Sequence, residues 1–121
     1  MKKYVVLAGI LLVTAASFGQ KKEIKKAERA LKNSDVAEAI GYINEAEATI
    51  ASADADMKTD FYVLKGQIYL ADAGNNGFEK MKQSADAFKK AMEMDADNKD
   101  AQIGVQQLRA ALVNSAVTDQ R

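Results

Sequence analysis

Apolar residues recur at helical spacing along this chain, in five segments that short polar breaks separate. The segments cover about 21–32, 36–52, 57–73, 78–94 and 99–117. Intervals of three and four residues place apolar side chains on one face of a helix, and the alternation typical of a strand does not occur. The chain also contains no proline, the residue that would interrupt a helix. We therefore expect an all-α chain of antiparallel hairpins with about five helices.

The breaks between these segments carry residues that end one helix and begin the next. They read Asn33-Ser34-Asp35, ADAD at 53–56, AGNNG at 73–77 and DADN at 95–98. Aspartate and asparagine side chains accept hydrogen bonds from the first free backbone N–H groups of a helix. We expect Asp35 to cap the second helix, with Glu38 three residues later as a reciprocal partner.

Residues 1–19 have the layout of a secretory signal peptide, in which a short basic start precedes an apolar run over about 4–13. Ser17 and Gly19 are small residues at the positions that signal peptidase reads, so we place cleavage after Gly19. A membrane anchor needs about 20 apolar residues, more than this segment holds, and a lipoprotein needs a cysteine that the chain lacks. We expect the domain at 20–121 to be exported to a bacterial periplasm, with secretion as the alternative, and not to insert stably into the membrane.

The composition argues against several kinds of function. The chain has no cysteine and no histidine, so it lacks thiol nucleophiles, the commonest general base and the commonest metal ligand. Its 17 basic and 17 acidic residues balance, and the signal peptide contains two of the lysines and no acid, which leaves a net charge of −2 after cleavage. This balance argues against nucleic acid as a partner. We expect no catalytic residue, no metal site and no cofactor, and hence no enzyme.

Two acidic runs, at 54–56 and 95–97, have a simpler explanation than metal binding. A calcium loop that began with the second run would need glycine and glutamate where the chain has Asp100 and Gln106. The glycine-rich loop at 74–77 lacks the Gly-Lys-Ser/Thr ending of a phosphate-binding loop. We interpret both acidic runs as helix-capping turns, the loop as a helix connection, and the lysines of the first segment as a solvated face.

A glycine inside a helix indicates a repeat. Gly66 stands between Tyr62 and Tyr69, although glycine in a helix interior costs roughly 1 kcal/mol relative to alanine. A missing side chain lets a neighbouring helix lie close. A shift of 45 residues also superposes the second segment on the fourth, with small, bulky and small residues in the same order. The pairs are Ala39 with Ser84, Ile43 with Phe88, and Ala46 with Ala91.

These positions resemble the tetratricopeptide repeat, whose two helices read W-x2-L-G-x2-Y and then A-x3-F. The matching residues are Tyr62, Gly66, Tyr69, Ser84, Phe88 and Ala91. Lys65 departs from the leucine of the pattern, and Ala96 departs from its proline. The resemblance implies a helical solenoid with repeats at 21–52 and 57–96 and a partial repeat at 98–118. It also implies that Gly66 lets the paired helix approach closely.

The resemblance further implies a binding surface, because the first helix of each repeat lines a concave face that holds a peptide or a partner protein. The residues that fall on this face are Ile24, Glu28, Leu31, Val63, Gln67, Leu70, Ile103 and Gln107. Aliphatic and amide side chains suit apolar peptide segments and argue against the gripping of a C-terminal carboxylate. We expect a non-catalytic protein-interaction module. The alternative for these residues is packing between neighbouring hairpins.

The last segment is apolar on two faces, whereas a terminal helix of a repeat array should be polar on its outer face. One stripe contains Leu108 and Leu112, and a second contains Ile103 and Val113. Two explanations stay open: the chain is the N-terminal portion of a longer structural scaffold, or it associates with itself through Leu108 and Leu112.

Overall fold

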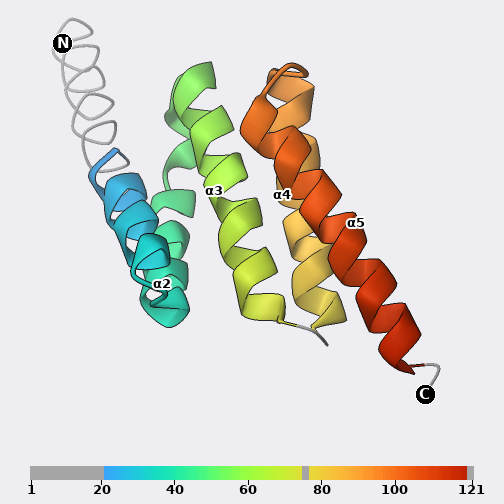
Figure 1. The fold of residues 1–121 in the computed structure, drawn as a ribbon. Coiled ribbons are helices and arrows are strands. Elements are labelled where there is room, and N and C mark those ends of the chain that lie inside the picture. Colours follow the sequence, from blue (N-terminus) through green and yellow to red (C-terminus); the bar gives the residue numbers. More distant parts are fainter. Residues whose placement is uncertain (1–20, 75–76, 120–121) are drawn as a thin grey trace, which may run out of the picture.

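The computed structural model describes residues 21–74 and 77–119, and the expected signal peptide and its cleavage site lie outside the described residues. Helices follow one another through this part of the chain without a strand (Figure 1), as expected for an all-α protein. The elements are a helix over 21–32, α2 (Val36–Glu47), a 3-10 turn (Ile50–Ser52), α3 (Ala55–Ala73), α4 (Phe78–Met94) and α5 (Lys99–Asp119).

Acidic and amide side chains in the predicted breaks cap the N-termini of three of these helices. Asp35 accepts a hydrogen bond from the Glu38 amide at 3.1 Å, and Asp54 accepts one from the Met57 amide at 2.8 Å. Asn98 accepts one from the amide of Ala101 in α5 at 3.0 Å. Each bond satisfies a backbone donor that has no partner within the helix. The acidic run before α3 is therefore a capping turn, as predicted.

The reciprocal bond that we expected from Glu38 is replaced by two other contacts. The backbone amide of Asp35 donates to the Ala30 carbonyl at 2.9 Å, so it is already satisfied by the preceding helix. The Glu38 carboxylate instead accepts a hydrogen bond from the Tyr42 hydroxyl at 3.0 Å. Of the two hydrogen bonds expected at the start of α2, only the one that the Asp35 side chain accepts is therefore formed.

The end of α2 also differs from the prediction, because the helix ends at Glu47 instead of near Ser52. The Thr49 amide donates to the Ala46 carbonyl at 3.2 Å, three residues back, and the chain tightens into the 3-10 turn that follows. Ile50 is nevertheless 4 % exposed, so the turn still delivers its apolar side chain to the core.

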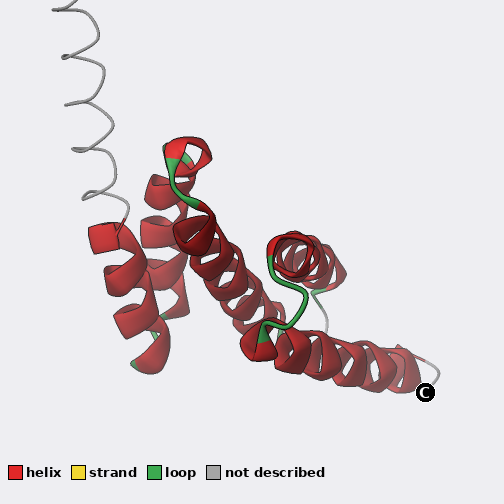
Figure 2. Ribbon diagram, turned by 90° about the horizontal axis from the view of Figure 1, so that it is seen from above, coloured by secondary structure: helices red, strands yellow, loops and turns green. Residues whose placement is uncertain are grey.

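Helix α3 lies at the centre of the domain, with the first hairpin on one side and α4 and α5 on the other (Figures 1 and 2). It contacts α2, α4 and α5, whereas the backbones of α2 and α4 do not approach each other. On one side of α3, Phe61, Leu64 and Ile68 form a buried cluster with apolar residues of the first hairpin. The two halves of the domain are therefore joined mainly through α3.

On the other side of α3, the buried ring of Phe88 lies between two glycines. A Cβ atom added to Gly66 of α3 would lie 2.6 Å from the Phe88 ring, and one added to Gly104 of α5 would overlap the same ring. The Ser84 hydroxyl, one turn before Phe88, donates to the Gly66 carbonyl at 2.6 Å. The close approach that the sequence predicted at Gly66 is therefore confirmed, and Gly104 adds a second one.

We expect alanine at these two glycines to destabilise the fold. Overpacking a filled core costs about 1–3 kcal/mol, which exceeds the gain of about 1 kcal/mol in helix propensity. The free energy of unfolding of Gly66→Ala and Gly104→Ala should therefore fall by up to about 2 kcal/mol, as measured by urea denaturation with circular dichroism.

Gly41→Ala is the matched control, because Gly41 is an exposed residue of α2 and a Cβ atom there would meet nothing within 4 Å. It should raise the free energy of unfolding by up to about 1 kcal/mol. Equal stabilisation by all three substitutions would show that the Phe88 ring does not need the glycines.

Candidate functional site

A groove of about 660 Å³ lies between the first helix and α3 and reaches the start of α5. Its lining contains apolar, acidic and basic side chains. The lining residues are Lys21, Ile24, Lys25, Glu28, Leu31, Lys32, Asp54, Asp56, Met57, Asp60, Val63, Leu64, Gln67, Asn98 and Asp100. The groove thus draws on three helices that are far apart in the sequence.

The groove brings together part of the surface that the repeat resemblance implied. Five of the eight residues expected on the concave face line it, namely Ile24, Glu28, Leu31, Val63 and Gln67. These residues come from the first helix and α3, whose central parts face each other across the groove. Val63 and Leu64 are almost fully buried and form its floor.

The other three expected residues do not line the groove. Leu70 packs against the buried cluster of Ala73, Met81 and Leu108. Ile103 is 51 % exposed and Gln107 is also exposed, both on α5. Helix α5 slants away from α3 towards its C-terminal end (Figure 1), so only its start reaches the groove.

Sequence reasoning missed the acidic character of the groove. Asp54 and Asp56 stand at the start of α3 and Asp100 stands in the first turn of α5, where acids interact favourably with the helix dipole. Asp60 lies one turn further along α3 and caps nothing. The signal was present in the sequence, because helices that run in the same direction bring their acidic starts to the same end of the domain.

Asp60 is the residue on which these negative charges act together. Burial raises the pKa of the Asp60 carboxyl, and the charges of Asp56, Glu28, Asp54 and Asp100 raise it further. Across the described residues, no three acidic side chains converge closely enough to hold a metal ion. The acids are therefore distributed along the groove and do not form a coordination site.

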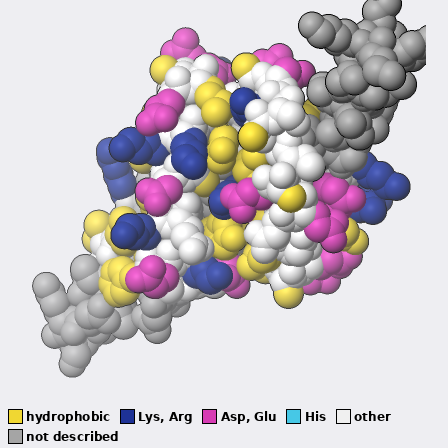
Figure 3. Space-filling model, turned by 180° about the vertical axis from the view of Figure 1, so that it is seen from behind, with side chains coloured by type: hydrophobic (Ala, Val, Ile, Leu, Met, Phe, Trp, Pro, Cys, Tyr) yellow, Lys and Arg dark blue, Asp and Glu magenta, His cyan; other side chains and the backbone are white. Residues whose placement is uncertain are grey.

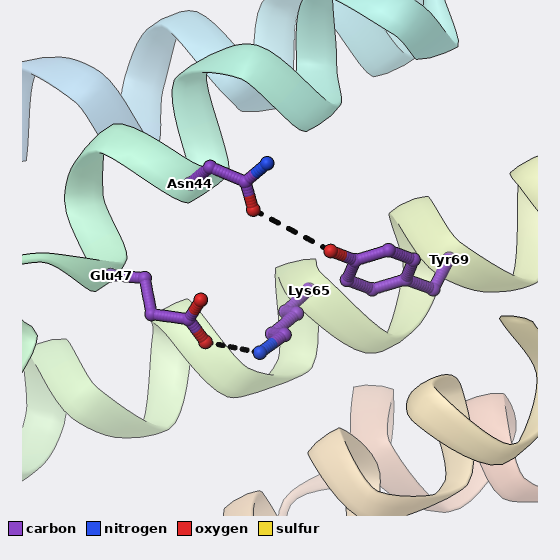
Figure 4. Close-up of polar contacts among 4 residues, drawn as sticks. All are labelled: Asn44, Glu47, Lys65 and Tyr69. Atoms are coloured by element: carbon purple, nitrogen blue, oxygen red, sulfur yellow. Dashed lines mark hydrogen bonds and ion pairs between the residues drawn. The ribbon is translucent and has the colours of Figure 1, made fainter.

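Polar contacts between α2 and α3 hold the first hairpin in place (Figure 4). Lys65 forms an ion pair with Glu47, and the Tyr69 hydroxyl donates to Asn44 at 3.5 Å. The Lys65 ammonium also lies 5.8 Å from the centre of the Tyr69 ring. Lys65 stands where the repeat pattern has leucine, and here it forms an ion pair that links α3 to α2.

The tyrosines of the repeat pattern lie under lysine side chains. Tyr62 packs between the two halves of the domain, and the Lys90 ammonium lies 5.2 Å from its ring centre. The Lys80 ammonium lies 5.2 Å from the centre of the Tyr69 ring.

The face turned away in Figure 1 shows a band of apolar side chains with charged ones around it (Figure 3).

The two leucines that we expected to mediate self-association have different environments. Leu108 is 4 % exposed and packs against Ala73 and Met81, so it belongs to the core of its own chain. Leu112 is 38 % exposed and Val113 is 61 % exposed. Leu108 is therefore not available for an association surface on α5, whereas Leu112 and Val113 are exposed.

Comparison of the chain with protein-family models, with curated proteins and with solved structures found no match. Within residues 21–74 and 77–119, none of the helices combines the length and the apolar character needed to cross a membrane.

The raised pKa of Asp60 predicts a specific pH dependence of stability. The folded chain holds the Asp60 proton at a higher pH than the unfolded chain, so this group favours the folded state as the pH falls through its folded pKa. Asp60→Asn should therefore raise the melting temperature near neutral pH, and this gain should shrink as the pH approaches the ordinary aspartate pKa of 3.8. Thermal melts of both proteins over this pH range measure the difference.

Asp86→Asn is the control for this measurement, because Asp86 is an exposed acid of α4 outside the groove. Its effect on the melting temperature should be smaller and should not follow the same pH dependence. If Asp60→Asn and Asp86→Asn behave alike at every pH, the negative field at Asp60 does not affect stability.

Proposed function

We propose that this chain is a non-catalytic protein-interaction module that binds a peptide segment of a partner protein in the groove between the first helix and α3. The observation that carries this proposal is that five residues expected from the repeat pattern line one groove. The groove volume of about 660 Å³ lies within the range of about 300–1,000 Å³ found for ligand sites. This volume suits a few side chains of a peptide and is too small for a folded domain.

The mechanism of binding is preorganisation. The first helix, α2 and α3 share a buried apolar cluster, and the ion pair between Lys65 and Glu47 links α2 to α3. A groove whose walls are already fixed loses little conformational entropy when a segment binds, so more of the contact energy contributes to affinity. Buried Val63 and Leu64 offer apolar contact, and Gln67 offers an amide that fixes the register of a bound backbone.

The proposal includes a tetratricopeptide-like architecture and an exported location. Support for the architecture comes from the consecutive hairpins and from the contact of Phe88 with Gly66, the residue that occupies the glycine position of the repeat pattern. Support for export comes from the sequence of residues 1–19, which reads as a signal peptide. The partner would then be a protein of the bacterial cell envelope or a secreted protein.

Photo-crosslinking from inside the groove tests this function. A photoreactive amino acid at Gln67 should crosslink one defined partner in the cells that produce the chain, because Gln67 lines the groove. The same amino acid at Lys82, an exposed residue of α4 outside the groove, should not crosslink it. Mass spectrometry of the crosslinked species identifies both the partner and the segment.

A variant of the groove provides the second half of the test. Ile24→Ser removes apolar contact from the groove wall and should reduce the crosslink from Gln67 by about tenfold, since burying such a side chain contributes about 1.5–3 kcal/mol. Its thermal melt should still show one cooperative transition. Equal crosslinking from Gln67 and Lys82, or a crosslink that Ile24→Ser leaves unchanged, would refute binding in the groove.

A structural scaffold is the second candidate, and the exposed apolar side chains of α5 favour it. Ile103, Leu112 and Val113 are 51 %, 38 % and 61 % exposed. Burying these side chains against a second copy or against further repeats would remove apolar area from water. The chain would then act as one part of a longer or self-assembled helical array.

Sedimentation of residues 20–121 distinguishes the scaffold from the groove. The scaffold function predicts an oligomer that Leu112→Glu dissociates into a folded monomer, because Leu112 is exposed on α5. Leu108→Glu is the contrasting variant, and it should lower the melting temperature of the monomer itself, because Leu108 is 4 % exposed. A wild-type chain that sediments as a monomer at high concentration would exclude the self-assembled form.

A further inference from the structure

The acids that line the groove outnumber the lysines. Five acids and three lysines line it. Lys32 forms an ion pair with Glu28 at 3.6 Å, which leaves Lys21 and Lys25 as exposed lysines of the first helix. With this ion pair set aside, four acids and two lysines line the groove. The lining of the groove therefore carries an excess of negative charge.

Three acids of the groove form no ion pair within residues 21–74 and 77–119. The ion pairs of this part of the chain involve Glu23, Glu28, Glu47 and Asp72. Asp56, Asp60 and Asp100 take part in none of them. Burial raises the pKa of the Asp60 carboxyl, and repulsion from neighbouring acids, Asp56 and Asp100 among them, raises it further. A positive charge placed beside these three residues would relieve this repulsion.

The acids are also next to apolar surface. Met57, Val63 and Leu64 line the same groove, together with Ile24 and Leu31 of the opposite wall. A ligand that fills the groove therefore meets aliphatic carbon and carboxylate together. A small inorganic cation would use only the carboxylates, and these do not converge as a metal site requires.

We propose that the segment bound in the groove is a cationic amphipathic peptide. Its lysine or arginine side chains lie against Asp56, Asp60 and Asp100, and its apolar side chains cover the aliphatic floor. This inference rests on the proposed function and adds the chemical class of the partner segment to it. Charge complementarity selects this class, because an acidic segment would bring further negative charge beside Asp60.

Three synthetic peptides test the inference, each labelled with a fluorophore for anisotropy measurements. The first alternates leucine with lysine, the second alternates leucine with glutamate, and the third alternates serine with lysine. The leucine–lysine peptide should bind residues 20–121 about tenfold more tightly than either of the others. The leucine–glutamate peptide loses the three ion pairs with the groove acids, and the serine–lysine peptide loses the apolar contact with the floor of the groove. The affinity should also fall as salt is added.

Two variants with the same change of charge locate the effect. Asp56→Asn/Asp60→Asn/Asp100→Asn should weaken binding of the leucine–lysine peptide by about tenfold. Asp86→Asn/Glu93→Gln/Asp97→Asn removes three exposed acids outside the groove, and it should change the affinity by less than about twofold. Thermal melts of both variants verify that each is folded.

The outcomes separate this inference from the function on which it rests. Equal binding of the leucine–glutamate peptide, equal losses in the two triple variants, or no binding of the leucine–lysine peptide would each overturn the cationic class. A partner that still crosslinks from Gln67 in that case would leave groove binding intact. Loss of the crosslink would instead remove the proposed function itself.

Discussion

The contact of one aromatic ring with two helix-interior glycines determines how three helices of this domain pack. Phe88 of α4 lies against Gly66 of α3 and Gly104 of α5. Because a side chain at either glycine would occupy the volume of the ring, the spacing of the helices is set by backbone contact on both sides of it. The Ser84 hydroxyl bonds the Gly66 carbonyl and so fixes the rotation of α4 about its axis. The same spacing places the start of α5, with Asp100, at the groove.

Most of the secondary structure could be predicted because local signals agree along the chain. Helices α3 and α4 begin and end at turns that contain glycine, aspartate or asparagine, and α5 begins at such a turn. The end of α2 lacks such a residue, and the 3-10 turn after Glu47 follows from hydrogen bonds that no spacing rule indicates. The apolar periodicity therefore predicted where the helices lie, and their ends were predicted well only where a capping residue marks them.

The sequence predicted the part of the site that the first helix and α3 form, and it did not predict the position of α5. The first helix and α3 face each other, and five of the six residues expected from them line the groove, all but Leu70. The direction in which α5 slants depends on packing, so the pattern could not show that Ile103 turns away or that Leu108 enters the core. Gly104 was missed for a related reason. The repeat pattern was matched at Gly66 alone, whereas the Phe88 ring also meets α5 at Gly104.

The succession of contacts along the chain has a consequence for the order in which the domain forms. Each helix packs mainly against its neighbours in sequence, and α2 and α4 do not approach each other. Closing short loops costs little entropy, so such a topology favours rapid folding. In a chain that enters its folding compartment N-terminus first, the first hairpin and α3 would already share their apolar cluster before α4 arrives. The Phe88 ring would then have one face against Gly66 and the other in water until Gly104 has emerged, which makes α5 the element whose arrival completes the domain.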